Sequence, residues 1–188
     1  MILGILSDSH GQHRHTAAAL AVLRQLGAEA FVHCGDVGGV EVLETLAGLR
    51  VWVVCGNTDC PDAALVHYAE AQGIVVTHAG PARIELDGRH LAAFHGHEPQ
   101  FGRLMDTLAG GALPPDFGRC DYVLHGHTHE ARTMQLGPVR VINPGALHRA
   151  VVHTVATLDL RKGLTRFWEV SDDPAELQPR AYHSDANV

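Results

Sequence analysis

Histidine is unusually frequent in this chain, with 15 among 188 residues, and the histidine positions indicate metal chemistry. Several of them, together with aspartates and an asparagine, lie at the end of a short apolar run and beside a glycine. The positions with this pattern are Asp8, His10, Asp36, Asn57, His95, His127 and His129. Imidazole, carboxylate and amide groups without a thiolate suit Mn²⁺, Fe²⁺, Co²⁺, Ni²⁺ or Zn²⁺ better than Ca²⁺ or Mg²⁺.

The number of these groups indicates how many ions they would hold. Seven ligands are too many for one open catalytic ion and about right for two. Two ions about 3.5–4 Å apart can clamp both sides of a phosphoryl centre and lower the pKa of a shared water. The residue set therefore predicts a pair of divalent ions and phosphate-ester hydrolysis.

Taken singly, most of these motifs have an ordinary explanation. A turn or a helix cap would account for Asp8-Ser9-His10, for Gly35-Asp36 and for Gly56-Asn57. His95 at a strand end would pass for a hydrogen-bonded core histidine. His127 and His129 are harder to explain in this way, because side chains two positions apart on extended backbone point the same way. The joint occurrence, always at a strand end, favours a functional site.

The elements that must position these residues alternate in the first half of the chain. Apolar runs predict strands at 2–6, 30–34 and 51–54, and amphipathic patterns predict helices at 16–26 and 40–49. Strands that alternate with helices indicate parallel pairing in α/β layers. The carboxyl ends of parallel strands meet at one edge of the sheet, so the residues that follow them converge.

The second half predicts shorter strands, one helix and several tight turns. The strands are expected at 74–77, 82–86, 89–94, 122–124, 133–136, 139–142, 151–160 and 164–170, and the helix at 101–108. Asp87-Gly88 is a strong hairpin turn. We treat residues 1–170 as a single domain and 171–188 as a polar tail that is loose or ordered by a partner.

Composition narrows the class of protein. A formal net charge of −7 argues against strong binding to a nucleic-acid backbone. Metal ions can still supply positive charge locally for a phosphate substrate. No run approaches the ~20 apolar residues of a membrane span, and the first residues lack a signal-peptide pattern. The cysteines form no CxxC pair and are Cys34, Cys55, Cys60 and Cys120. We therefore expect a cytoplasmic protein with reduced thiols and no membrane association.

The ordered motifs resemble those of the calcineurin-like metallophosphoesterases, and most closely their small bacterial and archaeal branch of phosphodiesterases, the YfcE-like group. The motifs that carry the resemblance are Asp8-Ser9-His10, Gly35-Asp36, Gly56-Asn57-Thr58-Asp59, His95-Gly96-His97, His125-Gly126-His127-Thr128-His129 and Ile142-Asn143-Pro144-Gly145. The resemblance implies an α/β fold, an αββα sandwich of two facing mixed β-sheets flanked by helices.

The resemblance also implies a role for each site residue. Asp8, His10 and His129 would hold one metal, and Asn57, His95 and His127 the other, with Asp36 bridging both. Mn²⁺ is the ion that we expect first. A metal-bridging water or hydroxide would attack phosphorus in line with the leaving oxygen. The metals and the Asn57 amide would stabilise charge on the phosphoryl oxygens.

One position departs from the larger members of the family. Those proteins carry a histidine, the general acid, where this chain has Thr58. Asp59 remains as a catalytic candidate without that partner. His97 is a candidate to replace that histidine as the proton donor. An equally weighted alternative is that His97 holds a metal ligand in place or contacts the phosphate. We expect leaving groups that need little protonation, and we expect His125 to orient a ligand.

Two other functions compete with the enzyme. The same fold occurs in a retromer subunit, vacuolar sorting protein 29, which serves as a binding platform, so a non-catalytic interaction domain is the main alternative. A metal-storage domain would cluster its histidines in runs, whereas these are dispersed to strand ends. Competent residues at all seven ligand positions favour a hydrolase of small phosphodiesters. The small branch often self-associates, which leaves a homo-oligomer open.

Overall fold

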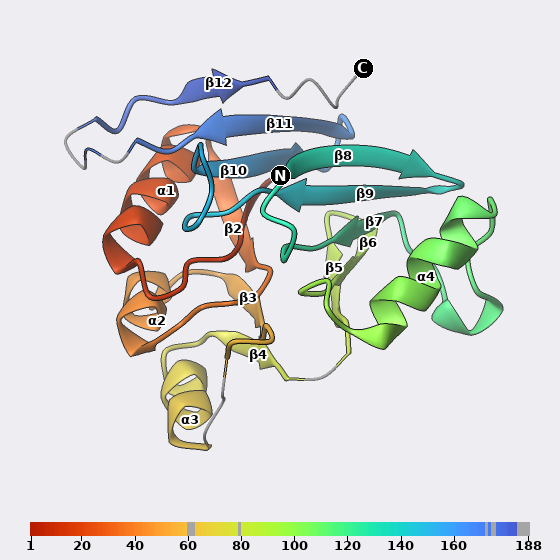
Figure 1. Ribbon diagram of the computed structural model, residues 1–188, viewed down its shortest axis with the longest axis horizontal. Helices are drawn as coiled ribbons and strands as arrows, with labels where there is room; N and C mark the ends of the chain where they lie inside the picture. Colours follow the sequence, from red (N-terminus) through yellow and green to blue (C-terminus); the bar gives the residue numbers. More distant parts are fainter. Residues whose placement is uncertain (60–62, 79, 172, 174–175, 184–188) are drawn as a thin grey trace.

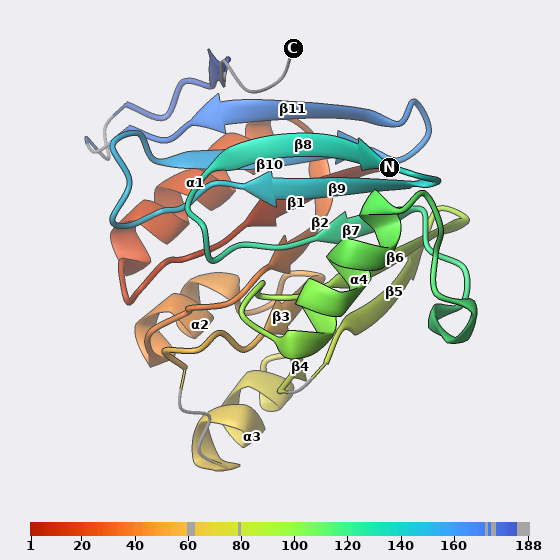
Figure 2. The same cartoon turned by 45° about the vertical axis from the view of Figure 1, so that its right-hand side comes forward.

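The fold is two β-sheets packed face to face with helices on their outer sides (Figures 1 and 2). The structure is a computed structural model, and it describes residues 1–59, 63–78, 80–171, 173 and 176–183. One sheet has seven strands in the order β12-β11-β10-β1-β2-β3-β4, and the other has five in the order β5-β6-β7-β9-β8. The expected αββα sandwich is therefore confirmed.

The seven-stranded sheet contains the parallel strands of the first half of the chain. They are β1 (Ile2–Leu6), β2 (Ala28–His33), β3 (Val51–Val54) and β4 (Val75–Thr77). The antiparallel strands β10 (Thr154–Asp159), β11 (Leu164–Glu169) and β12 (Arg180–Tyr182) extend it beyond β1. The helices α1 (His13–Gln25), α2 (Val40–Leu46) and α3 (Ala63–Ala71) lie on the side of this sheet that faces away from the other (Figure 1).

The five-stranded sheet is mixed. Its strands are β5 (Ala82–Leu86), β6 (Arg89–Ala93), β7 (Tyr122–Leu124), β8 (Ala131–Leu136) and β9 (Val139–Pro144), of which β6, β7 and β9 are parallel. The helix α4 (Pro99–Ala109) covers its outer face (Figure 2), and a short 3₁₀ turn, η1 (Pro115–Phe117), follows. The predicted hairpin turn at Asp87-Gly88 joins paired strands, and turns at Gly137-Pro138 and Lys162-Gly163 join two further pairs.

The core has three apolar layers because alternate strand residues point to opposite faces. In β1, Leu3 and Ile5 enter the layer between the sheets, while Leu6 enters the layer beneath α1 and α2. Gly4 also faces the helices, and an added Cβ there would lie 2.8 Å from the Phe31 ring. The third layer, around Phe94, lies between the five-stranded sheet and α4.

Several elements differ from the sequence prediction. The helix α1 begins three residues earlier than expected, and α4 begins at Pro99, a residue suited to a first helical turn. The helix α3 was not predicted, and of its described residues only Ala69 is buried, so it lacks an apolar stripe for sequence analysis to detect. Part of the expected loose tail is ordered, because Tyr182 pairs with Phe167 to form β12.

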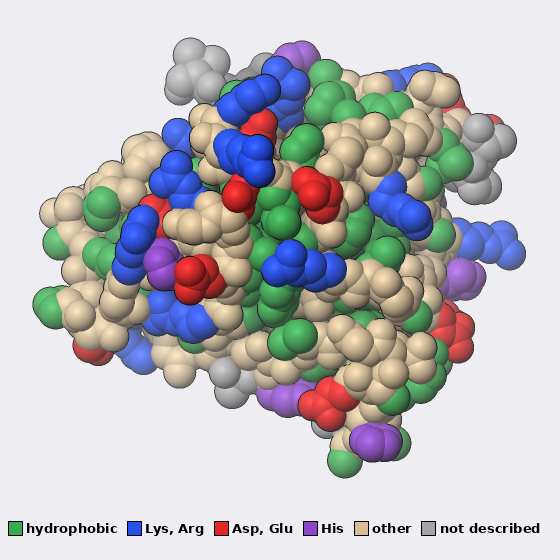
Figure 3. Space-filling model, turned by 180° about the vertical axis from the view of Figure 1, so that it is seen from behind, with side chains coloured by type: hydrophobic (Ala, Val, Ile, Leu, Met, Phe, Trp, Pro, Cys, Tyr) green, Lys and Arg blue, Asp and Glu red, His purple; other side chains and the backbone are tan. Residues whose placement is uncertain are grey.

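The two ends of the sandwich differ in character. The carboxyl ends of β1, β2, β3, β6 and β7 lead into the loops that carry the predicted ligands. At the opposite end, the ion pair Arg161–Asp87 (3.1 Å) joins a turn of each sheet, and Arg89–Asp121 (3.6 Å) joins β6 to the residue before β7 within the five-stranded sheet. Seen from behind, the surface mixes basic, acidic and apolar side chains (Figure 3). Within the described residues, no helix has the length and apolarity that crossing a bilayer requires.

A substitution at Val123 tests whether the apolar layer under α4 stabilises β7. This strand leads into the last ligand loop. The Val123 side chain is fully buried in that layer. We expect Val123→Ala to lower the free energy of unfolding by about 2–3 kcal/mol, since it removes two buried carbons and leaves a cavity. Val151→Ala is the matched control, because Val151 is fully exposed, and it should change stability by less than about 0.5 kcal/mol. Equal effects in denaturant titrations would contradict this packing.

Candidate metal centre

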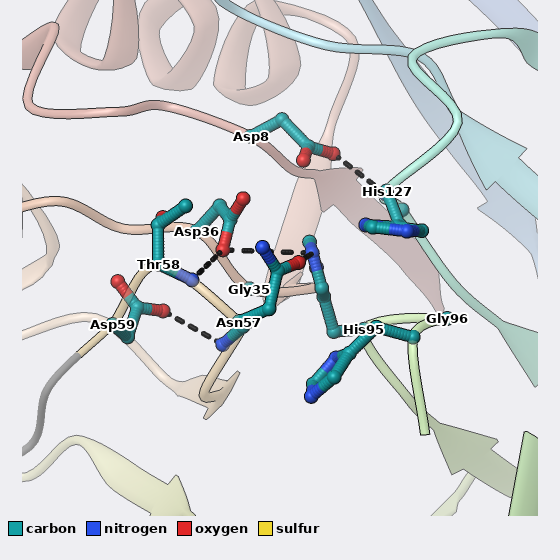
Figure 4. A network of polar contacts seen from close by, with 12 residues as sticks. Asp8, Gly35, Asp36, Asn57, Thr58, Asp59, His95, Gly96 and His127 are labelled. Carbon is teal, nitrogen blue, oxygen red and sulfur yellow. Dashed lines mark hydrogen bonds and ion pairs between the residues drawn. The ribbon is translucent and has the colours of Figure 1, made fainter. Parts of the chain in front are cut away.

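The structure brings all seven predicted ligand positions together at one edge of the sandwich. Figure 4 shows Asp8, Asp36, Asn57, His95 and His127 among them. Each lies just beyond a strand end, as the sequence indicated. Asp8 and His10 follow β1, Asp36 follows β2, and Asn57 follows β3. The residues that come from the other sheet are His95, after β6, and His127 and His129, after β7. The site therefore lies between the two sheets and needs both of them.

Two buried carboxylates form the middle of this group. Asp36 Oδ2 lies 3.5 Å from His10 Nε2, and Asp36 Oδ1 lies 3.5 Å from His95 Nε2. Asp8 Oδ1 lies 3.2 Å from His129 Nε2, while Asp8 Oδ2 accepts the backbone N–H of His127 at 3.1 Å. The two carboxylates thus connect histidines from three separate loops.

The other two ligand positions join the group through His95. Asn57 Oδ1 lies 3.1 Å from His95 Nε2. The His127 ring stands edge-on to the His95 ring, with 5.0 Å between their centroids. Asn57 and His127 therefore gather around His95, which contacts Asp36 Oδ1, whereas His10 contacts Asp36 Oδ2.

Five of the seven residues have an unusual backbone conformation. Positive φ angles occur at Asp8 (55°), His10 (44°), Asp36 (53°), His127 (69°) and His129 (60°). Residues other than glycine rarely adopt this region, and each such residue costs roughly 1–2 kcal/mol. The prediction of extended backbone at His127 and His129 was therefore wrong. Their rings reach the centre from a tight loop, whose turns direct both side chains inward.

Hydrogen bonds fix which nitrogen of two histidines faces the centre. His95 Nδ1 donates to the Cys34 carbonyl at 2.8 Å, and His129 Nδ1 donates to the Arg149 carbonyl at 3.3 Å. In each ring the Nε2 atom is then left to face a carboxylate. Histidines that bind metals through Nε2 are held in this way, with the other nitrogen donating to a carbonyl.

Burial and charge shift the pKa values in the centre. Burial acts to raise the pKa of Asp36, but hydrogen bonds from His95 and from the Thr58 amide outweigh it, and the pKa lies well below its usual range. Burial acts to lower the pKa of His95, yet its contacts with Asp36 and the Cys34 carbonyl raise it overall. Burial lowers the pKa of His10 and of His127. The centre therefore favours an ionised Asp36 together with neutral imidazoles at His10 and His127.

The donors present fit a divalent metal ion. Two triads have ligand atoms within 4.8 Å of one another, namely Asp8–His10–His129 and Asp8–Asp36–His95. Within the described residues, the buried atoms Asp8 Oδ1 and His10 Nε2 have no hydrogen-bond partner. Leaving such atoms unsatisfied costs free energy, and a bound cation would satisfy both.

Asp59 braces two of the ligand loops. Its carboxylate accepts backbone N–H groups from Val37 (3.2 Å), Gly38 (3.0 Å) and Gly56 (2.8 Å). It therefore ties the loop that carries Asp36 to the loop that carries Asn57. Both oxygens are occupied by these amides, so the geometry gives Asp59 a positioning role and no free atom for proton transfer.

His97 lies at the rim of the centre and is partly exposed. Its ring centroid is 5.3 Å from that of His95 and 6.2 Å from that of His127. Its Nδ1 is 3.8 Å from Glu98 Oε2, beyond hydrogen-bond distance. Of the three predicted catalytic residues, Asn57 and His97 can face a substrate, and Asp59 faces backbone amides.

Three polar residues that hold the ligand loops were not singled out in this role from the sequence. Glu98 accepts the backbone N–H groups of His95 (2.9 Å) and Gly96 (2.7 Å). Asn143 donates to the Gly126 carbonyl and accepts from the Gly145 amide, both at 2.9 Å. The position of Glu98, three residues after a ligand and before Pro99, is a sequence signal that could have found it.

His33 is the third of these residues, and its ring is fully buried. Its Nδ1 accepts the Gly35 N–H at 3.2 Å, and its Nε2 donates to the Ser9 hydroxyl at 2.7 Å. Burial lowers the pKa of His33 to about 4, which keeps the ring neutral at pH 7. It therefore links the loop after β1 to the loop after β2.

His125, which was expected to orient a ligand, contacts backbone instead. Its Nδ1 donates to the Gly126 carbonyl at 3.0 Å, and its ring lies 4.8 Å from that of Phe101. Burial lowers the pKa of His125 to about 4. Its influence on His127 runs through the chain and not through a hydrogen bond to a ligand ring.

The described cysteines take no part in the candidate centre. Cys34, Cys55 and Cys120 are free thiols, and Cys60 lies outside the described residues. Burial raises the pKa of Cys55 to about 11. The expectation of reduced thiols therefore agrees with three of the four cysteines.

Asp59 provides a test of the brace between the two loops. We expect Asp59→Ala to lower the free energy of unfolding by about 2 kcal/mol or more, because three amides lose a charged acceptor. Mn²⁺ affinity, measured by calorimetry, should fall about 10–100-fold, which is the range seen when a residue that orients a metal ligand is removed. Asp59→Asn should be milder, and Asp106→Ala on α4 should leave both quantities unchanged. Normal metal affinity in Asp59→Ala would refute the positioning role.

Gly126 tests how closely the last ligand loop approaches Asp8. An added Cβ would lie 1.9 Å from Ser7 Oγ and 2.6 Å from Asp8 Oδ2. We expect Gly126→Ala to cost about 1–3 kcal/mol in stability through overpacking and to weaken Mn²⁺ binding. Gly102→Ala in α4 is the control, since nothing lies within 4 Å of its Cβ. That control should stabilise the protein by about 0.5–1 kcal/mol in thermal unfolding.

Known proteins share this sequence pattern. The phosphodiesterase MJ0936 of Methanocaldococcus jannaschii is 25% identical over 169 residues, which cover 86% of this chain and 95% of that protein. The probable metallophosphoesterase MJ0623 of the same organism is 26% identical over 150 residues, covering 78% and 68%.

Solved structures share the fold. One described as a novel archaeal phosphodiesterase has a TM-score of 0.76 at 23% identity, covering 90% of this chain and 99% of that one. The phosphoesterase YfcE of E. coli has a TM-score of 0.65 at 23% identity, with 99% of both chains covered. A Vps29 variant from Entamoeba histolytica has a TM-score of 0.62 at 20% identity over the whole of both chains.

The family model for the calcineurin-like phosphoesterase superfamily domain matches residues 1–163. That span includes every ligand position of the candidate centre. The chain therefore belongs to the calcineurin-like phosphoesterase superfamily.

Proposed function

We propose that this protein is a phosphodiesterase that hydrolyses small phosphate esters with two divalent metal ions. The observation that carries the proposal is the convergence of two buried carboxylates, one amide and four imidazoles from five loops, in which the buried atoms Asp8 Oδ1 and His10 Nε2 have no hydrogen-bond partner. Burying this many charged and polar groups without a cation would be costly. The curated phosphodiesterase relative agrees with this function.

We divide the donors into two sets around Asp36. Asp8, His10 and His129 form one set, which we assign to the first ion. Asn57, His95 and His127 form the other set, which we assign to the second. Asp36 contacts a histidine of each set through a different oxygen and is the bridging ligand in this proposal.

The metal ions would supply Lewis-acid activation of the phosphoryl group and a water of lowered pKa. Their donor set of imidazoles, carboxylates and one amide suits Mn²⁺ first, with Ni²⁺, Fe²⁺, Co²⁺ or Zn²⁺ as alternatives. The low pKa of Asp36 keeps this carboxylate ionised and available at neutral pH.

The protein's own residues orient the ester. Asn57 Oδ1 faces His95 Nε2, which leaves its Nδ2 to donate a hydrogen bond to a phosphoryl oxygen. Charge that develops on that oxygen during attack would strengthen this bond. His97, at the rim, is positioned to contact the ester oxygens on the same side.

Proton delivery to the leaving group is the weak point of this centre. Thr58 occupies the position of the family's acid, and its backbone N–H is committed to Asp36 Oδ1 at 2.9 Å. The Asp59 oxygens are committed to backbone amides. We therefore propose that aryl and other leaving groups of low pKa are preferred, because they depart without protonation.

A binding platform is the competing function, because Vps29 proteins share this fold. The observation in its favour is the loss of the general acid at Thr58. Retention of the complete donor set favours the hydrolase, since a platform has no need to keep five residues at positive φ.

Turnover with defined metals separates these functions. Metal-stripped protein should hydrolyse bis(p-nitrophenyl) phosphate after addition of Mn²⁺ or Ni²⁺, less well with Mg²⁺, and bind two ions per chain by mass spectrometry or elemental analysis. Asp36→Asn should lose activity by about 100-fold or more, as expected when a bridging charge is removed. Asp106→Asn on α4 should keep it. Folded protein that binds metal without turnover would favour the platform.

A further inference from the structure

A cavity adjoins the candidate metal centre, and none of the seven ligand positions lines it. Its volume is about 340 Å³, and it lies between the chain that leaves β4 and the start of α4. The walls include His78, Gly80, His97, Gln100 and Arg103. A Cβ added at Gly80 would lie 3.9 Å from Gln100 Oε1, so the two walls face each other.

The cavity begins one side chain away from the centre. His97 lines it, and the His97 ring lies 5.3 Å from the ring of His95. On the opposite wall, His78 Nδ1 is 3.5 Å from Cys55 Sγ, two residues before Asn57. A substrate whose phosphoryl group sits among the ligands would therefore extend one arm into this cavity.

The groups that line the cavity are donors of hydrogen bonds or carry positive charge. Arg103 projects from the first turns of α4, and no carboxylate among the described residues lies within salt-bridge distance of its guanidinium. The one acidic wall residue is Glu98, whose two oxygens are occupied by the backbone N–H groups of His95 and Gly96. The cavity thus presents one guanidinium without an ion pair among the described residues, beside a carboxylate that is turned to backbone amides.

We propose that this cavity is a subsite for a second anionic group on the substrate, with Arg103 as its specificity-determining residue. The inference rests on the proposed hydrolase function and adds a substrate class, namely phosphodiesters whose retained alcohol carries a phosphate or a carboxylate. A guanidinium is suited to either anion because its paired N–H groups match two oxygens. His78, His97 and Gln100 would supply further hydrogen bonds.

Three p-nitrophenyl diesters of similar size test the subsite in the metal-loaded protein. Their second alcohols are butyl, 3-carboxypropyl and 3-phosphonopropyl, so only the charge at the end of the arm differs. We expect Arg103→Ala to lower the kcat/KM ratio of a charged ester to the butyl ester about tenfold, mainly through KM, in line with loss of a charge-assisted hydrogen bond. Arg103→Glu should lower this ratio further.

Arg24→Ala supplies the matched control, because Arg24 is also an exposed arginine on a helix and lies far from the cavity. It should leave the ratio unchanged. The ester with the larger loss in Arg103→Ala identifies phosphate or carboxylate as the better ligand. An unchanged ratio in both Arg103 variants would overturn the subsite.

Binding without turnover keeps this test independent of the hydrolase proposal. Methylphosphonate or acetate, titrated into metal-free protein, should shift the nuclear magnetic resonance signals of the Arg103 side chain and the His78 ring. These shifts should disappear for His78 in Arg103→Ala and persist in Arg24→Ala. Absence of shifts at millimolar anion would overturn the subsite even if the protein hydrolyses esters. Shifts without hydrolysis of any ester would support the subsite and remove the hydrolase.

Discussion

The carboxylate of Asp36 is the contact point on which the rest of the site depends. It lies between His10 from the first sheet and His95 from the second, and the Thr58 amide fixes one of its oxygens. An ionised carboxylate buried between two sheets requires positive charge or hydrogen-bond donors on every side. The loops around it are arranged to supply both, and this requirement accounts for the close approach of the two sheets at this edge.

The energetic cost of that arrangement appears in the backbone. Five ligand positions adopt left-handed conformations that residues with side chains avoid. Hydrogen bonds to other backbone groups of the ligand loops help to offset this cost: Asp59 and Glu98 accept amide hydrogens, Asn143 binds a carbonyl and an amide, and His33 accepts one amide hydrogen. Such supports keep the donor atoms in place before any ion binds, and preorganisation of this kind strengthens metal binding.

The candidate ligands and the cavity beside them contribute differently to substrate selectivity. The ligands form a compact set that would treat the phosphoryl group of many esters alike. Selectivity must then come from what lies next to the centre, and the described chain offers there the cavity that reaches Arg103. With Thr58 at the acid position, the identity of the leaving group matters more than in a site that can protonate it.

The sequence by itself predicted the candidate ligand positions, and it determined the αββα architecture and most strand bounds. It could do so because apolar runs followed by Asp, Asn or His beside glycine are local signals, and their order matched a known family. Departures from the family's motifs at single positions, such as Thr58, could also be detected in the sequence, because residue type alone decides whether a side chain can donate a proton.

Tertiary structure decided how the ligands are held and which nearby residues act on them. Asp59 was expected to act in catalysis, yet its oxygens face amides from residues about twenty positions earlier, a contact that no local pattern encodes. His33 and Glu98 support ligand loops through similar contacts, while β12 and α3 depend on packing that carries no strong sequence period. Local propensity and motif order fix residue types along the chain, whereas hydrogen-bond partners depend on which loops the folded sheets bring together.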